Sequence, residues 1–440
     1  MDVFEFLLPP IYLCIVLVIA YKYSAKRVNI DNAYRFFLPG LLAKISGAIL
    51  LGLVYTLYYS GGDTINYYHT ASTLVNLMFD NFDNFVYVYF GKPALSEQYL
   101  LGETSYNCYW VSDEFSFFVS KCYTPIVFLC FKSYFASAIV TASICYIGVW
   151  RMYLVFVNEF PQIAKHLAWV ILFVPSVLFW GSGIMKDSIT FSATCIYVYG
   201  FYWFFVKKQF KISFLVNLAL GIYLLIMIKP YIFFAILPGS LIWFVVLRIN
   251  KIKNEFARAI FVPVFIAFGF LAGLFILKSI GSYLGGYSLE KIIKTASGAQ
   301  QDLKQSYYGG NTFDIGDYEP TVGGLLSVSH KAIFASLFRP TIFDARNIVM
   351  FISSIENAFI LLFCIYLLIR LKVYRFFGLV SSHPLLLFSF IFSIFFAFSV
   401  GVSVSNFGTL VRLKIPCIPF FLSSLVILNY MLRQKDEPKD

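Results

Sequence analysis

Apolar runs of about twenty residues recur along the whole chain, with short polar segments between them. A run of that length is enough for a helix to cross the hydrocarbon core of a bilayer. The expected fold class is therefore all-α: a polytopic bundle of about eleven transmembrane helices in which residues 1–440 form a single membrane domain. The predicted spans are 4–22, 37–59, 134–152, 167–182, 188–206, 212–228, 231–248, 259–279, 347–369, 380–403 and 413–432.

The composition supports a lipid environment. Hydrophobic residues make up 60% of the chain and charged residues 13%, whereas soluble domains have about 25% charged residues. The first apolar run lacks the basic start and the cleavage site of a signal peptide, so we expect it to remain as a span. The eight Cys show no metal-binding spacing. A disulfide between Cys108 and Cys122 is geometrically possible, but neither their spacing nor the number of Cys requires it.

The net charge of +11 would suggest nucleic acid as a partner of a soluble protein, but no basic–aromatic stripe supports that partner here. The Lys and Arg residues instead collect in alternate loops, as the positive-inside rule predicts for cytoplasmic loops. This arrangement predicts that the N-terminus lies outside and the C-terminus lies in the cytoplasm. The basic clusters lie at 22–35, 207–211, 248–258, 370–375 and 433–435.

Two large loops are then expected on the outer face, at 60–133 and at 280–346. The charge pattern holds only if the apolar run 115–131 does not cross the membrane. This run is short and contains Lys121 and Pro125, so we expect an amphipathic helix at the outer interface. Loops of this size in a compact bundle are usually functional or disordered.

Asp63 directly follows a predicted span, in a Gly-Gly turn, with Tyr67 and His69 close behind it. A carboxylate held at the membrane surface could act as a general base or as a metal ligand. The alternative for Asp63 is an ordinary helix cap, and the alternative for His69 is a plain interfacial residue. Tyr67 and His69 are candidate supporting residues for the same site.

Polar and charged residues also stand at the outer ends of later spans, where charge is costly unless it lines a site. We predict that the cations bind a substrate phosphate, because Lys and Arg are its usual ligands. The alternatives are local ion pairs, helix caps and side chains that snorkel to the interface. The candidate phosphate-binding residues are Lys186, Lys229, Arg339 and Arg412, with Asp187, Asn406 and Lys414 as supporting residues.

Together these residues give one face of the membrane a carboxylate and several cations. Transfer of a sugar from a polyprenyl phosphate donor to a glycan acceptor needs both kinds of group, for the acceptor proton and for the leaving phosphate. No glycine-rich nucleotide loop occurs, which disfavours a nucleotide-sugar donor. Two alternatives that are not enzymes stay open: a transporter of a lipid-linked or anionic substrate, and an envelope assembly scaffold.

Short motifs at these positions resemble the GT-C superfamily of membrane glycosyltransferases, which use lipid-linked donors. The pattern Gly62-Asp63 followed by Tyr67 is similar to the G-D-x-x-x-Y pattern of that family's first outer loop. The family's later Ser-Gly hairpin and its span-terminal Lys are matched by Pro175, Ser182, Gly183, Asp187 and Lys229. The resemblance covers about the first 250 residues, with scattered motifs after them.

The segments FWGSGIMKDS, LFRPTIFDARN and NFGTLVRLKIPCIPF are also similar to bacterial membrane proteins grouped with polysaccharide polymerases. These resemblances imply a GT-C-like fold and sugar transfer at the outer face of the membrane. They also imply that Asp63 is the catalytic base or a ligand of a divalent metal ion. The family often has an Asp-Asp or Asp-Glu pair where this chain has a single Asp, so the metal requirement stays open.

Overall fold

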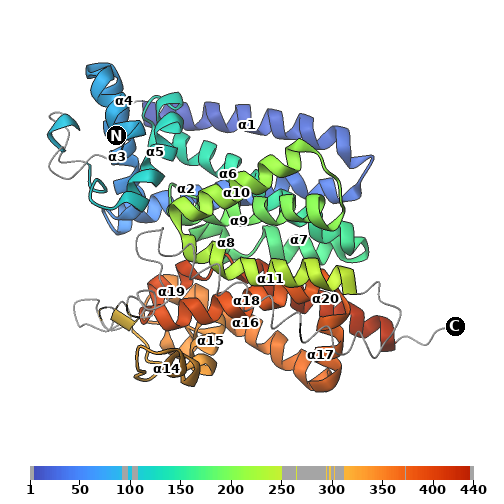
Figure 1. Ribbon diagram of the computed structural model, residues 1–440. Coiled ribbons are helices and arrows are strands. Elements are labelled where there is room, and N and C mark those ends of the chain that lie inside the picture. Colours follow the sequence, from blue (N-terminus) through green and yellow to red (C-terminus); the bar gives the residue numbers. More distant parts are fainter. Residues whose placement is uncertain are drawn as a thin grey trace. The chain divides into compact units, whose positions relative to one another are not determined.

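The computed structural model describes residues 4–91, 98–101, 108–249, 312–371 and 373–436, with a few isolated positions between 264 and 302. Within these residues the regular structure is helical, apart from one isolated bridge between Thr312 and Asn406. The chain, whose helices are drawn in Figure 1, divides into two compact units, and some unit boundaries fall within a helix. Unit 1 comprises Met1–Val157, Leu172–Gly200 and Val216–Pro230, and unit 2 comprises Asn158–Ile171, Phe201–Leu215 and Tyr231–Asp440.

Seven helices of the described residues are long and apolar enough to cross a membrane, or eight if a bent pair counts as one span. The prediction of an all-helical, multi-pass membrane protein is therefore confirmed. The predicted span at 259–279 lies outside the described residues, apart from the isolated Val264. The seven helices are Glu5–Val28, Asn32–Tyr58, Tyr134–Glu159, Lys186–Val206, Pro230–Arg248, Ile348–Arg370 and Pro384–Ser403, and the bent pair is Phe407–Leu413 with Ile418–Gln434.

Two predicted spans differ from the structure at a proline. The region 167–182 forms two short helices, α7 (Ala164–Leu172) and α8 (Pro175–Trp180), rather than one continuous helix. Val174 between them is extended, with φ −68° and ψ 120°, because the proline ring disfavours helical geometry in the preceding residue. The region 380–403 is likewise interrupted: α17 (Val373–Ser382) ends at Ser382, and α18 (Pro384–Ser403) begins at Pro384.

The helices of unit 1 place the predicted outer loop 60–133 at one end of the long apolar helices. Three helices of this loop, α3, α4 and α5, lie together there (Figure 1). The run 115–131 falls in α5, which packs against α3. The elements of unit 1 are α1 (Phe4–Val28), η1 (Asn32–Phe36), α2 (Phe37–Leu53), η2 (Val54–Tyr58), α3 (Asp63–Asp80), α4 (Phe82–Phe90), α5 (Glu114–Leu129), α6 (Tyr134–Glu159, to Val157), α8, α9 (Lys186–Phe201, to Gly200) and α10 (Ile212–Ile228, from Val216).

Close approach between helix backbones holds the centre of unit 1 together. A Cβ atom on Gly148 of α6 would lie 2.6 Å from the carbonyl oxygen of Ser192 in α9. A Cβ atom on Gly221 of α10 would lie 2.9 Å from the carbonyl oxygen of Ala193, which also belongs to α9. Small residues at helix interfaces are typical of membrane proteins, because lipid supplies no hydrophobic force between helices and packing must replace it.

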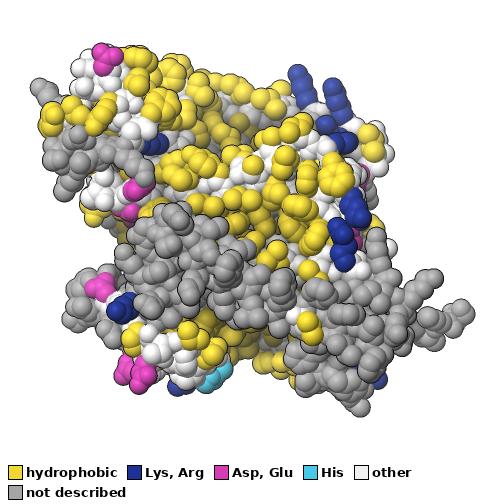
Figure 2. All heavy atoms as spheres, viewed as in Figure 1, with side chains coloured by type: hydrophobic (Ala, Val, Ile, Leu, Met, Phe, Trp, Pro, Cys, Tyr) yellow, Lys and Arg dark blue, Asp and Glu magenta, His cyan; other side chains and the backbone are white. Residues whose placement is uncertain are grey.

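The outward flank of α1 is apolar along its length. Phe6, Ile11, Ile15 and Ile19 are all at least half exposed, as expected of a surface covered by lipid tails rather than water. Figure 2 shows this hydrophobic flank, with Lys and Arg gathered at the end where α1 finishes. The charge pattern of this helix is therefore that of a span with one basic end.

Unit 2 is built around α18, which packs against α15, α17 and α20. The α19–α20 pair is bent by 66°, at the segment that holds Lys414 and Pro416. The elements of unit 2 are η4 (Pro161–Ile163), α7 to Ile171, η5 (Tyr202–Val206), α11 (Pro230–Ile249, from Tyr231), α14 (Val322–Ser327), α15 (Ser329–Phe338), η7 (Ile342–Asp344), α16 (Ile348–Arg370), α17 (Val373–Ser382), α18 (Pro384–Ser403), α19 (Phe407–Leu413) and α20 (Ile418–Asp436).

Candidate functional site

The hairpin between α8 and α9 carries two of the predicted site residues, Lys186 and Asp187, in unit 1. Helix α5 fixes the hairpin through Tyr123, whose hydroxyl donates to the Met185 carbonyl at 2.8 Å and accepts from the Met185 amide at 3.0 Å. Tyr123 is buried, so these two hydrogen bonds form away from water. The segment before Lys186 is therefore held in one conformation.

Helix α2 holds the same hairpin from another direction. Lys44 is buried and donates to the carbonyl of Gly181. A Cβ atom on Gly47, one turn later, would lie 2.1 Å from the Leu178 carbonyl oxygen, so only glycine lets α8 come this close. The sequence offered a signal for Lys44 that the predicted site does not include: a lysine inside a predicted span.

Lys186 pairs with Asp113, which precedes α5. The Lys186 Nζ atom lies 3.3 Å from Asp113 Oδ2, and the two side chains are 18% and 42% exposed. Burial opposes ionisation of Asp113, but hydrogen bonds from Ser116 and Lys186 and the Lys186 charge outweigh it and lower the pKa of Asp113. The pair is therefore charged, partly open to solvent, and able to meet a ligand without a large desolvation cost.

Asp187 pairs with Lys229 deeper in unit 1. Lys229 stands between α10 and α11, and its Nζ atom lies 2.5 Å from Asp187 Oδ1. The side chains are 1% and 9% exposed for Asp187 and Lys229. The two residues were predicted separately, as a supporting residue and a phosphate ligand, and the structure brings them together as one buried ion pair.

Helix α3 joins this cluster through a pair of aromatic rings. Tyr67 is buried and stacks on Trp110, with centroids 5.1 Å apart and planes 17° apart. The Lys186 Nζ atom lies 5.6 Å from the centroid of Trp110, within the range of a cation–π contact. Asp63 begins α3 one turn before Tyr67 and shares its helix face. The structure thus places Tyr67 and Lys186 in one cluster through Trp110.

Not every residue predicted near Asp63 joins that face of α3. His69 lies two residues after Tyr67, about 200° around the helix axis, and is exposed with its ring against Tyr68. Asp63 follows Gly62, which occupies the N-cap position with a φ of 116°. Asp63 is therefore in the first helical turn, where the helix dipole favours a negative charge.

A second cluster lies in unit 2 around Arg339. Its guanidinium donates to Asp344 through Nε at 3.1 Å and through Nη2 at 2.7 Å. It also lies over the rings of Phe313 and Phe407, at 5.4 and 5.1 Å from their centroids. Burial raises the pKa of the Asp344 carboxyl, but hydrogen bonds from Arg339 and Thr341 outweigh it and lower that pKa. Arg339 is thus a fixed, charged donor.

Lys414 supports this cluster from inside unit 2. It is 1% exposed, and its ammonium donates to Asn357 Oδ1 at 2.7 Å and to the Arg339 carbonyl at 3.1 Å. Asn357 in turn donates to the Pro340 carbonyl at 2.9 Å. Lys414 therefore holds the backbone that carries Arg339 and does not face solvent. Asn357 was not among the predicted residues, although a polar amide within an apolar span was a signal for it.

Two further predicted residues lie on α19 of unit 2. Asn406 caps the helix, accepting from the Thr409 amide at 3.2 Å, and bridges to Thr312. Arg412 is half-buried in the last turn. Both belong to the same unit as Arg339, and the structure shows neither of them lining the pocket next to it.

His, Cys, Asp and Glu side chains, which are usual metal ligands in proteins, occur in both units of the described chain. No group of three or more His, Cys, Asp or Glu side chains there is arranged to hold a metal ion. Asp63 is therefore not part of such a group within the described residues. Cys108 is buried and Cys122 half-buried, and both are free thiols.

No protein-family model, curated protein or solved structure matches this chain.

Proposed function

We propose that this protein is a membrane glycosyltransferase or polysaccharide polymerase that transfers sugar from a polyprenyl-phosphate-linked donor. In this proposal it has a GT-C-like fold of about eleven spans in the bacterial inner membrane. Its N-terminus lies outside and its C-terminus in the cytoplasm, so the site of Asp63 and Lys186 faces outward. The acceptor is a growing glycan.

One observation carries the proposal: a partly open ion pair, Lys186 with Asp113, lies against the stacked rings of Tyr67 and Trp110 where an apolar helix begins. A lipid-linked phosphate needs a cation where the lipid tail leaves the membrane. Lys186 is the first residue of a helix, Lys186–Val206, that is long and apolar enough to cross a membrane. A sugar ring needs a flat apolar surface with polar groups at its edge. The half-buried Trp110 ring, backed by the buried Tyr67, supplies the surface, and Asp113 supplies the polar group.

The chemistry of the proposed step follows from these groups. An acceptor hydroxyl oxygen attacks the anomeric carbon and forms a new C–O bond. The bond from the anomeric carbon to the phosphate oxygen breaks, and the phosphate leaves with the electron pair. Asp63 takes the acceptor proton as general base, and Lys186 stabilises the charge that develops on the phosphate. Asp113 is a positioning residue that orients Lys186.

The test is turnover by the full chain in proteoliposomes supplied with a radiolabelled polyprenyl-phosphate sugar and a glycan acceptor. Loss of a general base costs about 10²–10⁴-fold, so Asp63→Asn is expected to lower kcat at least about 100-fold. Lys186→Met is expected to lower kcat/KM for the donor to a similar degree. The matched control is Lys132→Met in the same unit, since the Lys132 side chain is exposed and its Nζ atom donates to Asn76 Oδ1 at 2.9 Å, which is not a residue of the proposed site. Full activity of Asp63→Asn would refute the base assignment.

A transporter is the second candidate, because one feature of unit 2 favours it. The α19–α20 pair is bent by 66°, and the break holds the buried Lys414. Discontinuous helices of this kind form substrate sites in transporters. Counterflow of a labelled polyprenyl-phosphate sugar without any cleavage, unaffected by Asp63→Asn, would favour transport over transfer.

A further inference from the structure

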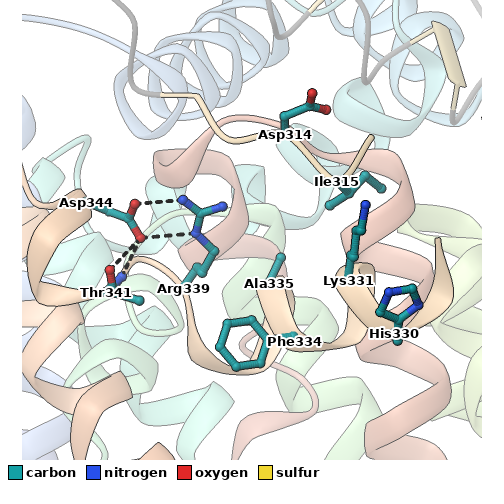
Figure 3. Close-up of a pocket in the computed structure, with 9 residues that line it drawn as sticks. All are labelled: Asp314, Ile315, His330, Lys331, Phe334, Ala335, Arg339, Thr341 and Asp344. Carbon is teal, nitrogen blue, oxygen red and sulfur yellow. Dashed lines mark hydrogen bonds and ion pairs between the residues drawn. The ribbon is translucent and has the colours of Figure 1, made fainter. Parts of the chain in front are cut away.

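A pocket opens beside Arg339 in unit 2, and the proposed transfer chemistry does not use it. Its volume is about 540 Å³, and helix α15, the turn after it and the segment at Asp314 line it. Figure 3 shows Arg339 and Lys331 rising from α15 toward the space below Asp314, with the ring of Phe334 along one side. Pockets of this size hold ligands of drug-like size, and two or three sugar rings fall in that class.

The spacing of residues on α15 forms one wall of this pocket. Lys331, Ala335 and Arg339 are four residues apart, so they follow one face from the helix into its C-cap. Each step advances about 6 Å along the axis, which places the two cations about 12 Å apart at their Cα atoms. Ala335 is small and leaves the space between them open. The wall therefore suits an extended ligand better than a single compact ion.

Arg339 and Lys331 differ in which of their donor groups can reach a ligand in the pocket. Arg339 gives Nε and Nη2 to Asp344, while Nη1 points away from Asp344 into the pocket (Figure 3). Asp344 also accepts from the Thr341 amide and hydroxyl, at 2.8 and 2.9 Å, so it holds the guanidinium in a fixed orientation. Lys331 is exposed, and within the described part of the chain it forms no ion pair.

The opposite rim adds hydrogen-bond acceptors and little apolar surface. Asp314 Oδ1 accepts from the Gly316 amide at 2.9 Å, which shapes the loop above the pocket. Gly316 has a φ of 92°, a conformation that favours glycine. The apolar lining consists of Ile315, Phe334 and Ala335, too little to cover an acyl chain. Asp314 faces Lys331 and Arg339 across a small apolar surface. This arrangement suits a ligand that has many hydroxyls and one acidic group.

We infer that this pocket binds an acidic saccharide, with its carboxylate or phosphate at Lys331 and its hydroxyls at Arg339 Nη1 and Asp314. This inference deepens the proposed function, because it names the class of the glycan acceptor, and it rests on that function for turnover alone. Binding itself requires no transfer chemistry. Nη1 of Arg339 carries two N–H donors, which suits the oxygens of two neighbouring hydroxyls on one sugar ring.

The test is equilibrium binding to the full chain in nanodiscs of phosphatidylcholine. The probes are trigalacturonate and maltotriose, which have the same number of rings and differ in charge. We expect trigalacturonate to bind at least about 10-fold more tightly than maltotriose. Lys331→Met is expected to remove that preference and Lys331→Arg to keep it. The control Lys211→Met removes an exposed charge elsewhere in unit 2 and is expected to change nothing.

Three results would overturn the inference. Equal binding of the two trisaccharides would exclude an acidic ligand, and unchanged binding in Lys331→Met would exclude this pocket. Complete displacement of trigalacturonate by phosphatidylglycerol in the nanodiscs would assign the pocket to a lipid headgroup. Kinetics separate this inference from the proposed function. Lys331→Met is expected to raise KM for an acidic acceptor and to leave KM for the donor unchanged. Asp63→Asn is expected to lower kcat at least about 100-fold without changing trisaccharide binding.

Discussion

Replacing Lys229 by Met would leave the Asp187 carboxylate buried without its cation. In the folded protein the two groups are 2.5 Å apart, with side chains 9% and 1% exposed. At that depth water cannot take the place of the lost ammonium. Removing one partner of a buried ion pair costs about 3–5 kcal/mol, since the remaining charge is desolvated and uncompensated.

We therefore expect Lys229→Met to lower the free energy of unfolding by about 3 kcal/mol or more. The double variant Lys229→Met with Asp187→Leu removes both charges and is expected to recover most of this loss. Unfolding is followed by tryptophan fluorescence in a dodecyl maltoside and sodium dodecyl sulfate series. The four proteins form a double-mutant cycle that isolates the coupling between the two residues.

The matched control is Lys207→Met. Lys207 pairs with Glu159 at 2.8 Å, and their side chains are 37% and 18% exposed. Pairs that water reaches contribute about 0–1 kcal/mol, and Glu159 keeps the hydrogen bond from the Tyr202 hydroxyl when Lys207 is replaced. A loss below about 1 kcal/mol in Lys229→Met, equal to that of Lys207→Met, would refute the reasoning. It would mean that the Asp187 carboxylate reaches water or another cation in the folded protein.

Two further predictions concern packing and pH. Gly148→Leu would push its side chain into the Ser192 backbone, where even a Cβ atom would lie 2.6 Å from the carbonyl oxygen. We expect the free energy of unfolding to fall by about 3 kcal/mol, with a lower yield of monodisperse protein in size-exclusion chromatography. A normal elution profile and yield would contradict this prediction. Asp344 has a folded-state pKa below its ordinary 3.8. The charged Asp344 therefore stabilises the fold fully above pH 3.8, and this stabilisation is lost as the pH falls from 3.8 toward the folded-state pKa. Asp344→Asn should therefore lower Tm at pH 7 and by less at pH 3.5; an equal difference at both values would show that ionisation of Asp344 does not stabilise the fold.

Several predicted helices agree with the structure to within a few residues. The predicted span 347–369 is α16, Ile348–Arg370, and 231–248 falls within α11, Pro230–Ile249. Hydrophobic length decides these helices locally, since a bilayer requires each segment to satisfy its own backbone hydrogen bonds. Pro175 also interrupts the helix through a local effect on Val174. We predicted one continuous span at 167–182 because the residues on both sides of Pro175 are apolar.

Only some of the site residues could be predicted from the sequence. Asp63, Lys186 and Lys229 stood out because charge at membrane depth is costly. Their partners did not stand out, because nothing near Lys186 in the chain indicates that Asp113 would reach it. The two residues are 73 positions apart.

The sequence by itself determined that this protein is helical and embedded in a membrane, because each helix depends on its own apolar length and backbone hydrogen bonds. Only the tertiary structure decided which charges meet. Lys414, predicted at a membrane surface, is buried against Asn357, 57 positions away. Lys331, which no motif marked, faces an open pocket. Pairing and burial depend on helix packing, which acts between segments far apart in the chain.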